Sequence, residues 1–317
     1  MSKITRKLLQ ELHNKPTISN GRSFAPGGIC ALKHKMDCCD GRGFQIITEG
    51  PYTRAEVCAC VQTCPACFGQ TRVVREGYAT PCQHPSPTRI AAIINNAKIP
   101  SRYGYSTLKN FSNHTGNCFE KRNEIVQWLH SFDKSKSKGL LIEGPVGIGK
   151  TYIIAAIGHA LAKMGVSVQF VDFFQLLSEL KAGYSKNKAD TNLIKPMIDV
   201  DVLIIDELGK GRNSDWEISI LDQLVMGRYN QNKPIIASTN YKAKSSQKVQ
   251  LFKELDQPDS SFRENQFEEP LEDRVGERIF SRLLETCHVI AMEGDNYRLQ
   301  PQMPQSDNSY QPPHALQ

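Results

Sequence analysis

A glycine-rich loop at residues 144–151 limits the folds open to this chain more than any other feature of its sequence. The loop matches the pattern G-x-x-x-x-G-K-[ST] in full and lies between a strand-like run, Gly139–Glu143, and a helix-like run, Thr151–Met164. Glycines in such a loop let backbone N–H groups curl around phosphates at the positive end of the following helix. Lys150 would reach the β- and γ-phosphate oxygens, and the Thr151 hydroxyl would ligate Mg²⁺. The predicted nucleotide-binding residues of the loop are Gly144, Pro145, Val146, Gly147, Ile148, Gly149, Lys150 and Thr151.

From residue 139 onward, apolar strand-like runs alternate with helix-like runs. This alternation predicts an α/β fold in which a parallel sheet lies between helices, with right-handed crossovers. The further predicted strands are Ser167–Asp172, Val200–Ile205, Pro234–Thr239 and His288–Met292. The further predicted helices are Phe173–Tyr184, Asp215–Asn230 and Leu271–Glu285.

Two acidic residues, Asp206 and Glu207, directly follow the apolar run Val202–Ile205. A buried strand would deliver Asp206 to the water shell of Mg²⁺ and leave Glu207 placed to polarise an attacking water as a general base. The next predicted strand ends before Asn240, whose amide could orient that water or contact the γ-phosphate. Adjacent carboxylates after a strand are common, but together with the glycine-rich loop they predict a nucleotide hydrolase.

Eight of the ten cysteines lie between residues 30 and 82, in close pairs that belong to two similar repeats. Close thiol pairs in a chain without an export signal indicate metal binding rather than disulfides. Each repeat is predicted to form a hairpin-bearing knuckle, and Cys-x-Cys and Cys-x-x-Cys pairs suit tetrahedral Zn²⁺. The first repeat lacks one donor, which Cys38, Cys30 or His34 could supply. The predicted ligands of two structural zinc ions are Cys38, Cys39, Cys58, Cys60, Cys64, Cys67, Cys82 and His84.

Composition excludes several other classes of protein. The net charge of +6 is compatible with a polyanionic partner without indicating one. No apolar run approaches the roughly 18 residues that a membrane helix needs. The first 24 residues lack the apolar region of a secretion signal, so we expect a cytoplasmic protein.

These motifs resemble those of the AAA+ ATPases, and within them the DnaC/IstB group of bacterial helicase loaders and transposition helper ATPases. The resemblance covers roughly residues 95–298. Besides the loop, it rests on Ile99-Pro-Ser-Arg102-Tyr103, Ile205-Asp206-Glu207-Leu208-Gly209, Ser238-Thr239-Asn240, Arg274-Val-Gly276-Glu277-Arg278-Ile-Phe-Ser-Arg282-Leu283 and Asp295-Asn-Tyr297-Arg298. It implies an α/β AAA+ domain, a parallel sheet flanked by helices. It also implies the lack of a full C-terminal lid, because only 19 residues follow Arg298.

The resemblance also implies roles for further residues. Asn240 resembles the sensor 1 residue, and Arg298 occupies the sensor 2 position. Arg282 resembles the arginine finger that reaches the γ-phosphate of a neighbouring subunit, with Arg278 one turn earlier as its rival. A finger acting in trans implies a homo-oligomer whose active sites are completed on assembly. The cysteine region resembles the zinc knuckles of DnaJ-type and helicase-loader N-terminal domains, which makes this part a small β-rich module.

The leading functional hypothesis is an ATP- and Mg²⁺-dependent loader of a DnaB-type replicative helicase onto single-stranded DNA. The alternatives are an IstB-like transposition helper ATPase and a non-hydrolysing, ATP-gated adaptor. The residues predicted to contact DNA are Lys181, Tyr184, Lys186, Lys188, Lys210 and Arg212. The expected organisation is an amphipathic segment (1–25), a zinc module (26–88), a helical linker (89–138), the ATPase domain (139–298) with a flexible insertion (241–270), and a disordered tail (299–317).

Overall fold

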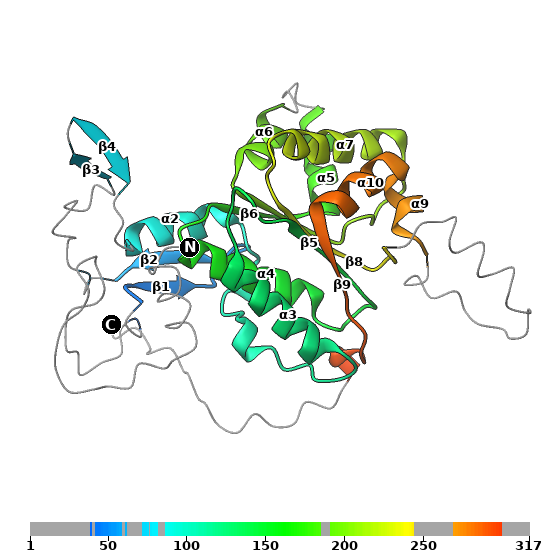
Figure 1. The fold of residues 1–317 in the computed structure, drawn as a ribbon, viewed down its shortest axis with the longest axis horizontal. Coiled ribbons are helices and arrows are strands. Elements are labelled where there is room, and N and C mark those ends of the chain that lie inside the picture. Colours follow the sequence, from blue (N-terminus) through cyan, green and yellow to red (C-terminus); the bar gives the residue numbers. More distant parts are fainter. Residues whose placement is uncertain are drawn as a thin grey trace, which may run out of the picture.

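The computed structural model describes residues 39, 42–58, 61, 72–75, 77–81, 86–184, 191–243 and 269–299. Its centre is a five-stranded parallel sheet with the strand order β6-β7-β8-β5-β9 (Figure 1). The strands of this sheet are β5 (Gly139–Glu143), β6 (Val168–Asp172), β7 (Val202–Asp206), β8 (Ile235–Thr239) and β9 (Cys287–Ala291). The parallel sheet confirms the α/β class predicted from the alternation of strand-like and helix-like runs.

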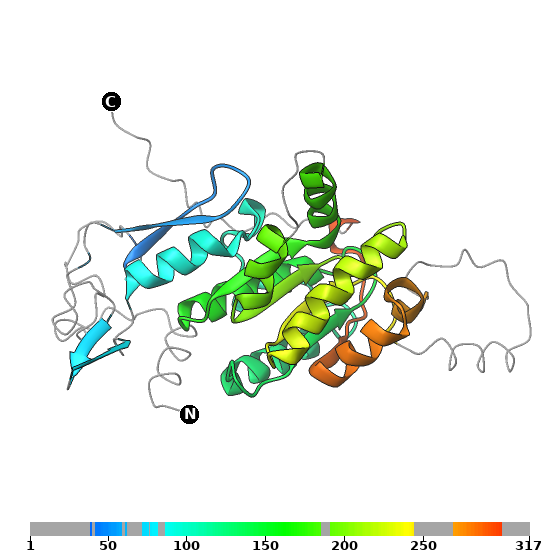
Figure 2. The same ribbon diagram turned by 90° about the horizontal axis from the view of Figure 1, so that it is seen from above.

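Helices cover both faces of the sheet (Figures 1 and 2). Residues along a strand alternate between the faces, so Leu140 and Ile142 pack in one hydrophobic cluster and Leu141 packs in the other. The first cluster includes residues of α2 (Pro87–Ala97), α3 (Cys118–Ser131) and α4 (Lys150–Lys163). The second includes residues of α5 (Phe173–Tyr184), α6 (Thr191–Asp199), α7 (Asp215–Asn230), α9 (Leu271–Val275) and α10 (Glu277–Thr286). Burial on both faces explains why the strands are apolar along almost their whole length.

Two helical segments differ from the sequence-based expectation. The predicted helix Leu271–Glu285 is divided at Gly276, whose φ of 82° lies in the left-handed region that glycine tolerates best. The division produces two helices, α9 and α10. The sequence pattern does not predict α6, because Pro196 stands inside it and breaks the helical signal.

Within the described residues, no helix has the length and apolar character to span a membrane.

Two antiparallel hairpins precede the sheet. They pair β1 (Phe44–Ile47) with β2 (Arg54–Val57), and β3 (Arg72–Arg75) with β4 (Tyr78–Pro81). They agree with the hairpin expected in each cysteine repeat. The β1–β2 hairpin lies along α2 in both ribbon views (Figures 1 and 2). Its residues Phe44 and Ala55 belong to the same hydrophobic cluster as residues of α2 and α4.

Hydrogen bonds also join the β1–β2 hairpin to the segment that follows α2. The Thr53 N–H donates to the Ile99 carbonyl at 2.7 Å, and the Ser101 N–H donates to the Pro51 carbonyl at 3.1 Å. Further side-chain hydrogen bonds link Tyr105 to Ile46 and Asn95 to Ala55. The hairpin and the 3₁₀ turn η1 (Ser101–Tyr103) are therefore one packed unit.

The ends of the predicted insertion at 241–270 lie side by side. The Lys242 N–H donates to the Glu269 carbonyl at 2.9 Å, and the Leu271 N–H donates to the Lys242 carbonyl at 2.8 Å. Residues 244–268, the predicted N-terminal segment 1–25 and the tail from residue 300 lie outside the described residues.

Candidate nucleotide site

The polar residues predicted to bind a nucleotide gather at the carboxyl ends of three central strands. The glycine-rich loop directly follows β5, Asp206 is the last residue of β7, and the half-buried Asn240 directly follows β8. Strand β8 lies between β5 and β7, and the register pairs Glu143 with Thr239. Strands that end in register bring these side chains to one edge of the sheet, which is where open α/β sheets bind ligands.

The glycine-rich loop packs against the last described segment of the chain. Gly147 has a φ of 86°, and a Cβ built there would overlap the side-chain amide of Asn296. The Tyr297 N–H donates to the Gly147 carbonyl at 3.0 Å. Asn296 and Tyr297 therefore pack directly on the loop, next in sequence to Arg298, the predicted sensor 2 residue.

Lys150 is the first residue of α4 and is only 7% exposed. Its ammonium donates hydrogen bonds of 2.7 Å to the carbonyls of Gly144 and Pro145. Burial lowers the pKa of Lys150 to about 8, and the nearby carboxylates of Asp206 and Glu207 oppose that shift. The loop thus encloses a cation that can pair with phosphate oxygens.

Asp206 is buried, with 6% of its surface exposed. Its Oδ1 atom accepts a hydrogen bond from the Thr151 hydroxyl at 3.1 Å and another from the Ser238 hydroxyl. Burial raises the pKa of Asp206, and these two hydrogen bonds oppose the rise. A buried carboxylate next to a hydroxyl oxygen supplies the hard oxygen ligands that Mg²⁺ prefers, and a divalent cation would offset the cost of burying this charge. Asp206 and Thr151 therefore fit the predicted Mg²⁺ site.

Glu207 is more exposed than Asp206, with 33% of its side chain accessible. Its φ of 55° is left-handed, which is uncommon for a residue with a long side chain. Its N–H donates to the Ser238 hydroxyl at 3.2 Å, and its carboxylate forms an ion pair with Lys210. That pairing raises the pKa of Lys210. The turn at Glu207 therefore places a solvent-accessible carboxylate next to the buried one.

Arg298 and Tyr103 also belong to the surroundings of the loop. Arg298 lies in the 3₁₀ turn η4 (Tyr297–Leu299), and its positive charge adds to burial in lowering the pKa of Lys150. Burial raises the pKa of Tyr103, the charge of Asp206 acts in the same direction, and a side-chain hydrogen bond with Thr151 opposes the rise. The phenol of Tyr103 is therefore next to the two proposed Mg²⁺ ligands.

The two candidate finger arginines lie on α10 and contact α7. The carboxylate of Asp222 is 3.5 Å from the guanidinium of Arg278 and 3.8 Å from that of Arg282. Arg282 is 20% exposed and lies 5.7 Å from the ring centre of Tyr229, whereas Arg278 is 65% exposed. The structure thus brings together, at one edge of the sheet, the loop, Asp206, Glu207 and Asn240. The two candidate fingers are not part of this group, because they lie on α10 and contact α7.

Two residues of the quoted motifs, Ser238 and Tyr103, lie at the site although the sequence assigns them no role there. The Ser238 hydroxyl contacts both acidic residues, Asp206 and Glu207. A signal for it exists, because a hydroxyl near the end of an apolar parallel strand can meet a carboxylate that ends the neighbouring strand. Tyr103 stands in the Ile99–Tyr103 motif, but its distance from the loop along the chain gives no hint of this contact.

Two of the predicted zinc ligands, Cys39 and Cys58, lie in the described part of the chain. Cys39 Sγ accepts a hydrogen bond from the Gly43 N–H at 3.4 Å, and the Cys58 N–H donates to the Gly43 carbonyl at 3.0 Å. Both cysteines are therefore at the open end of the β1–β2 hairpin. Considering the described residues alone, no group of three or more His, Cys, Asp or Glu side chains is placed to hold a metal. The predicted residues outside this part of the chain are Cys38, Cys60, Cys64, Cys67, Cys82, His84, Lys186 and Lys188.

A phosphate loop after one strand and an acidic pair after a nearby parallel strand define a P-loop nucleotide-binding protein. The model of the family described as IstB-like ATP binding protein matches residues 87–252, which is more than half of the chain. The chain therefore belongs to the family of IstB-like ATP binding proteins.

The curated relatives include insertion-sequence ATP-binding proteins and replicative helicase loaders. A Mycobacterium tuberculosis protein, named as an ATP-binding protein in an insertion sequence, is 27% identical over 176 residues, which are 55% of this chain and 59% of that protein. The replicative helicase loader DnaC of Escherichia coli is 28% identical over 134 residues, which are 41% of this chain and 54% of that protein. This chain thus spans less than two thirds of either relative. The crystal structure of the DnaC helicase loader shares 26% identity at a TM-score of 0.48 and covers 60% of this chain and 98% of its own.

Proposed function

We propose that this chain is an ATP-hydrolysing oligomeric switch that loads a DnaB-type replicative helicase onto single-stranded DNA. The observation that carries the hydrolysis is the pair Asp206–Glu207 beside the P-loop lysine. The pair combines a buried carboxylate suited to a metal with a second carboxylate that water can reach. Relatives named as helicase loaders support the partner, and the predicted cysteine module favours the loader over shorter transposition helpers.

The residues of the site have different roles in ATP hydrolysis. Loop N–H groups and the Lys150 ammonium bind the phosphates, and Thr151 and Asp206 hold Mg²⁺. Bound Mg²⁺ supplies positive charge to the β- and γ-phosphate oxygens. Glu207 accepts the proton of the attacking water, and Asn240 orients that water.

Assembly would complete the site. In the proposal, Arg282 acts as a finger on the γ-phosphate held by a neighbouring subunit, with Arg278 as the alternative, and Arg298 acts on the phosphates of its own chain. Asp222 lies near both candidate fingers within one chain. When the trans site forms, the finger arginine would therefore lose its contact with Asp222 and gain a contact with the γ-phosphate of the neighbouring subunit.

Phosphate release by the purified protein tests this proposal. We expect single-stranded DNA and the host's replicative helicase to raise the rate, and Lys150→Ala or Arg282→Ala to lower it by at least about tenfold, because each removes a cation from the phosphates. The exposed Lys195→Ala on α6 is the control for a lost surface lysine.

The trans arrangement is checked by mixing the two inactive variants. An interface between an Arg282→Ala subunit and a Lys150→Ala subunit contains one intact P-loop opposite one intact finger. We expect the mixture to regain part of the activity that each variant lacks alone. A mixture as inactive as its components would refute a finger acting in trans.

A second candidate function is that of a transposition helper ATPase of the IstB kind. The relative named as an insertion-sequence protein favours it. Such a helper would use the same nucleotide-binding residues as a helicase loader, so only the partner protein distinguishes the two functions. Phosphate release that responds to a transposase and is indifferent to the replicative helicase would favour this second function.

The proposed DNA contacts cluster near α5 and the loop after β7. The Lys181 ammonium lies 4.9 Å from the ring centre of Trp216 and pairs with Glu217 at 3.4 Å. The Lys210 ammonium lies 6.0 Å from the ring centre of Phe174, which is 51% exposed. Lysines beside accessible aromatic rings can pair with phosphates while a ring stacks on a base. This surface therefore suits single-stranded nucleic acid.

We also propose two structural zinc ions in the cysteine module. The N–H group that donates to Cys39 Sγ supports this, because such a bond stabilises a thiolate. Metal analysis of the purified chain is expected to find about two zinc ions per molecule. Cys58→Ser should lower the zinc content, whereas Cys118→Ala, in the hydrophobic core, should not. A metal-free wild-type protein would rule the module out.

A further inference from the structure

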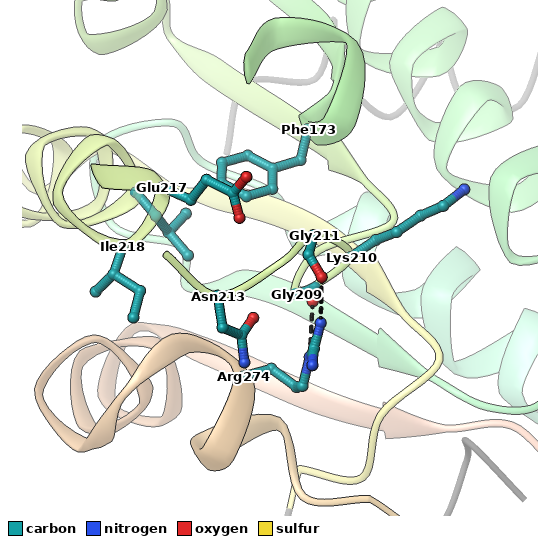
Figure 3. Close-up of a pocket in the computed structure, with 9 residues that line it drawn as sticks. Phe173, Gly209, Lys210, Gly211, Asn213, Glu217, Ile218 and Arg274 are labelled. Carbon is teal, nitrogen blue, oxygen red and sulfur yellow. Dashed lines mark hydrogen bonds between the residues drawn. The ribbon is translucent and has the colours of Figure 1, made fainter. Parts of the chain in front are cut away.

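The loop at 207–213 lies between β7 and α7 and begins with the proposed general base, Glu207. Figure 3 shows part of this loop, including Gly209 and Gly211. Glu207, Gly209 and Asn213 have φ angles of 55°, 86° and 55°. A left-handed backbone at a residue such as Glu207 costs on the order of 1 kcal/mol. Contacts from outside the loop are therefore needed to keep this shape.

Arg274 of α9 supplies contacts to the middle of the loop. Its Nε donates to the Gly209 carbonyl at 3.1 Å, and its Nη2 donates to the Gly211 carbonyl at 2.6 Å. Figure 3 shows both hydrogen bonds leaving the same guanidinium. A guanidinium is planar and its donors point in fixed directions, so one side chain can hold two carbonyls that lie two residues apart.

The rest of the loop is held by other elements. The Leu208 N–H donates to the Ser238 carbonyl of β8 at 2.8 Å. At the other end, the Arg212 N–H donates to Glu217 Oε2 of α7 at 2.9 Å. Arg274 therefore acts on the part of the loop between these two attachments, which begins two residues after Glu207.

The Arg274 side chain is itself kept in place. It is 19% exposed, and its guanidinium carbon lies 5.1 Å from the ring centre of Tyr241. The side-chain amide of Asn213 donates to the Asp273 carbonyl at 3.2 Å, which joins the end of the loop to the same helix. A fixed guanidinium can thus fix the loop in turn.

We propose that Arg274 is a positioning residue for ATP hydrolysis. By holding the carbonyls of Gly209 and Gly211, it keeps Glu207 in the left-handed turn that presents its carboxylate at the nucleotide site. This inference rests on the proposed hydrolysis. Because Gly276 joins α9 directly to α10, the helix pair that carries the proposed finger Arg282 also holds the loop of the general base.

The test measures kcat and KM for ATP hydrolysis, the Kd for ATP and the Tm of three variants. Arg274→Ala should lower kcat by about tenfold to a hundredfold, because displacing a catalytic group by about 1 Å can cost that much. Its KM and Kd should stay within about threefold of wild type, since the P-loop is not touched. The kcat of Arg274→Lys should lie between those of Arg274→Ala and the wild type, because a lysine ammonium keeps the charge but lacks the planar, fixed pair of donors of a guanidinium.

Glu269→Gln is the matched control. It removes the ion pair of Arg274 with a carboxylate that is 42% exposed and leaves both hydrogen bonds to the loop. Exposed pairs contribute little, so its kcat should equal that of the wild type. Hydrogen exchange gives a readout independent of turnover, and the amides of the 207–213 loop should exchange faster in Arg274→Ala than in Glu269→Gln.

The outcomes separate this inference from the proposed function. A wild-type protein that hydrolyses ATP, with Arg274→Ala equally active, would overturn the role of Arg274 alone. A wild-type protein that hydrolyses no ATP with DNA and helicase present would overturn both. If Arg274→Ala does not fold, Arg274→Lys decides: a lower kcat at unchanged KM supports the positioning role, and full activity refutes it.

Discussion

Replacing Glu207 with glutamine should lower the rate of ATP hydrolysis by about a hundredfold to ten-thousandfold, the usual contribution of a general base. Glutamine keeps the shape of the side chain but cannot accept a proton from water. Because Glu207 is 33% exposed, the neutral amide can be solvated and the fold should be preserved. The affinity for ATP should be retained, since Lys150 and the loop are unchanged.

Single-turnover phosphate release and the binding of a fluorescent ATP analogue measure the two quantities separately. Glu124→Gln, which removes an exposed pair with Lys121 on α3, is the control for the chemical change. Unchanged phosphate release in Glu207→Gln would contradict the assignment. It would favour the alternative of an adaptor that binds ATP without hydrolysing it.

Arg228→Met should lower the free energy of unfolding by about 3–5 kcal/mol, because it leaves several buried backbone carbonyls without a hydrogen-bond donor. Arg228 lies in α7 with 0% of its surface exposed. Burial lowers its pKa to about 10, so it is charged at neutral pH. Methionine fills much of the same space but donates no hydrogen bond. The backbone carbonyls that would lose their donor are those of Met197, Ile198, Val200, Asp201 and Pro234.

Thermal unfolding checks this loss, which should appear as a fall in Tm of about 10 °C for a domain of this size. Lys195→Met, on the exposed side of α6, introduces the same side chain without breaking a buried contact. A Tm equal to that of the control would mean that the carbonyls around Arg228 find other donors.

Much of the nucleotide site could be predicted from the sequence because local patterns define it. The glycine-rich loop needs only eight consecutive residues, and the apolar runs around it have the composition of buried parallel strands. Asp206 and Asn240 each stand at the end of such a run. Parallel strands in register then bring them together without any further information.

The contacts between distant parts of the chain could not be predicted in this way. Arg228 and Arg274 have the pattern of ordinary basic residues on helices, and their carbonyl partners become visible only when the helices are packed. Tyr103, in a 3₁₀ turn, has its pKa raised by burial and changed further by Asp206 and Thr151, which lie far along the sequence. The division of the helix Leu271–Glu285 depends on the backbone angle of Gly276, which the sequence pattern leaves open.

The β1–β2 hairpin has a consequence for any attempt to isolate the nucleotide-binding part. The family match begins at residue 87, the first residue of α2. A fragment cut there would lose Phe44 and Ala55, which are 2% and 3% exposed, and would leave an apolar side of α2 in water. It would also remove the donor to the Ile99 carbonyl, close to Tyr103. The shortest fragment that keeps this packing must therefore start before β1, and it carries part of the cysteine region with it.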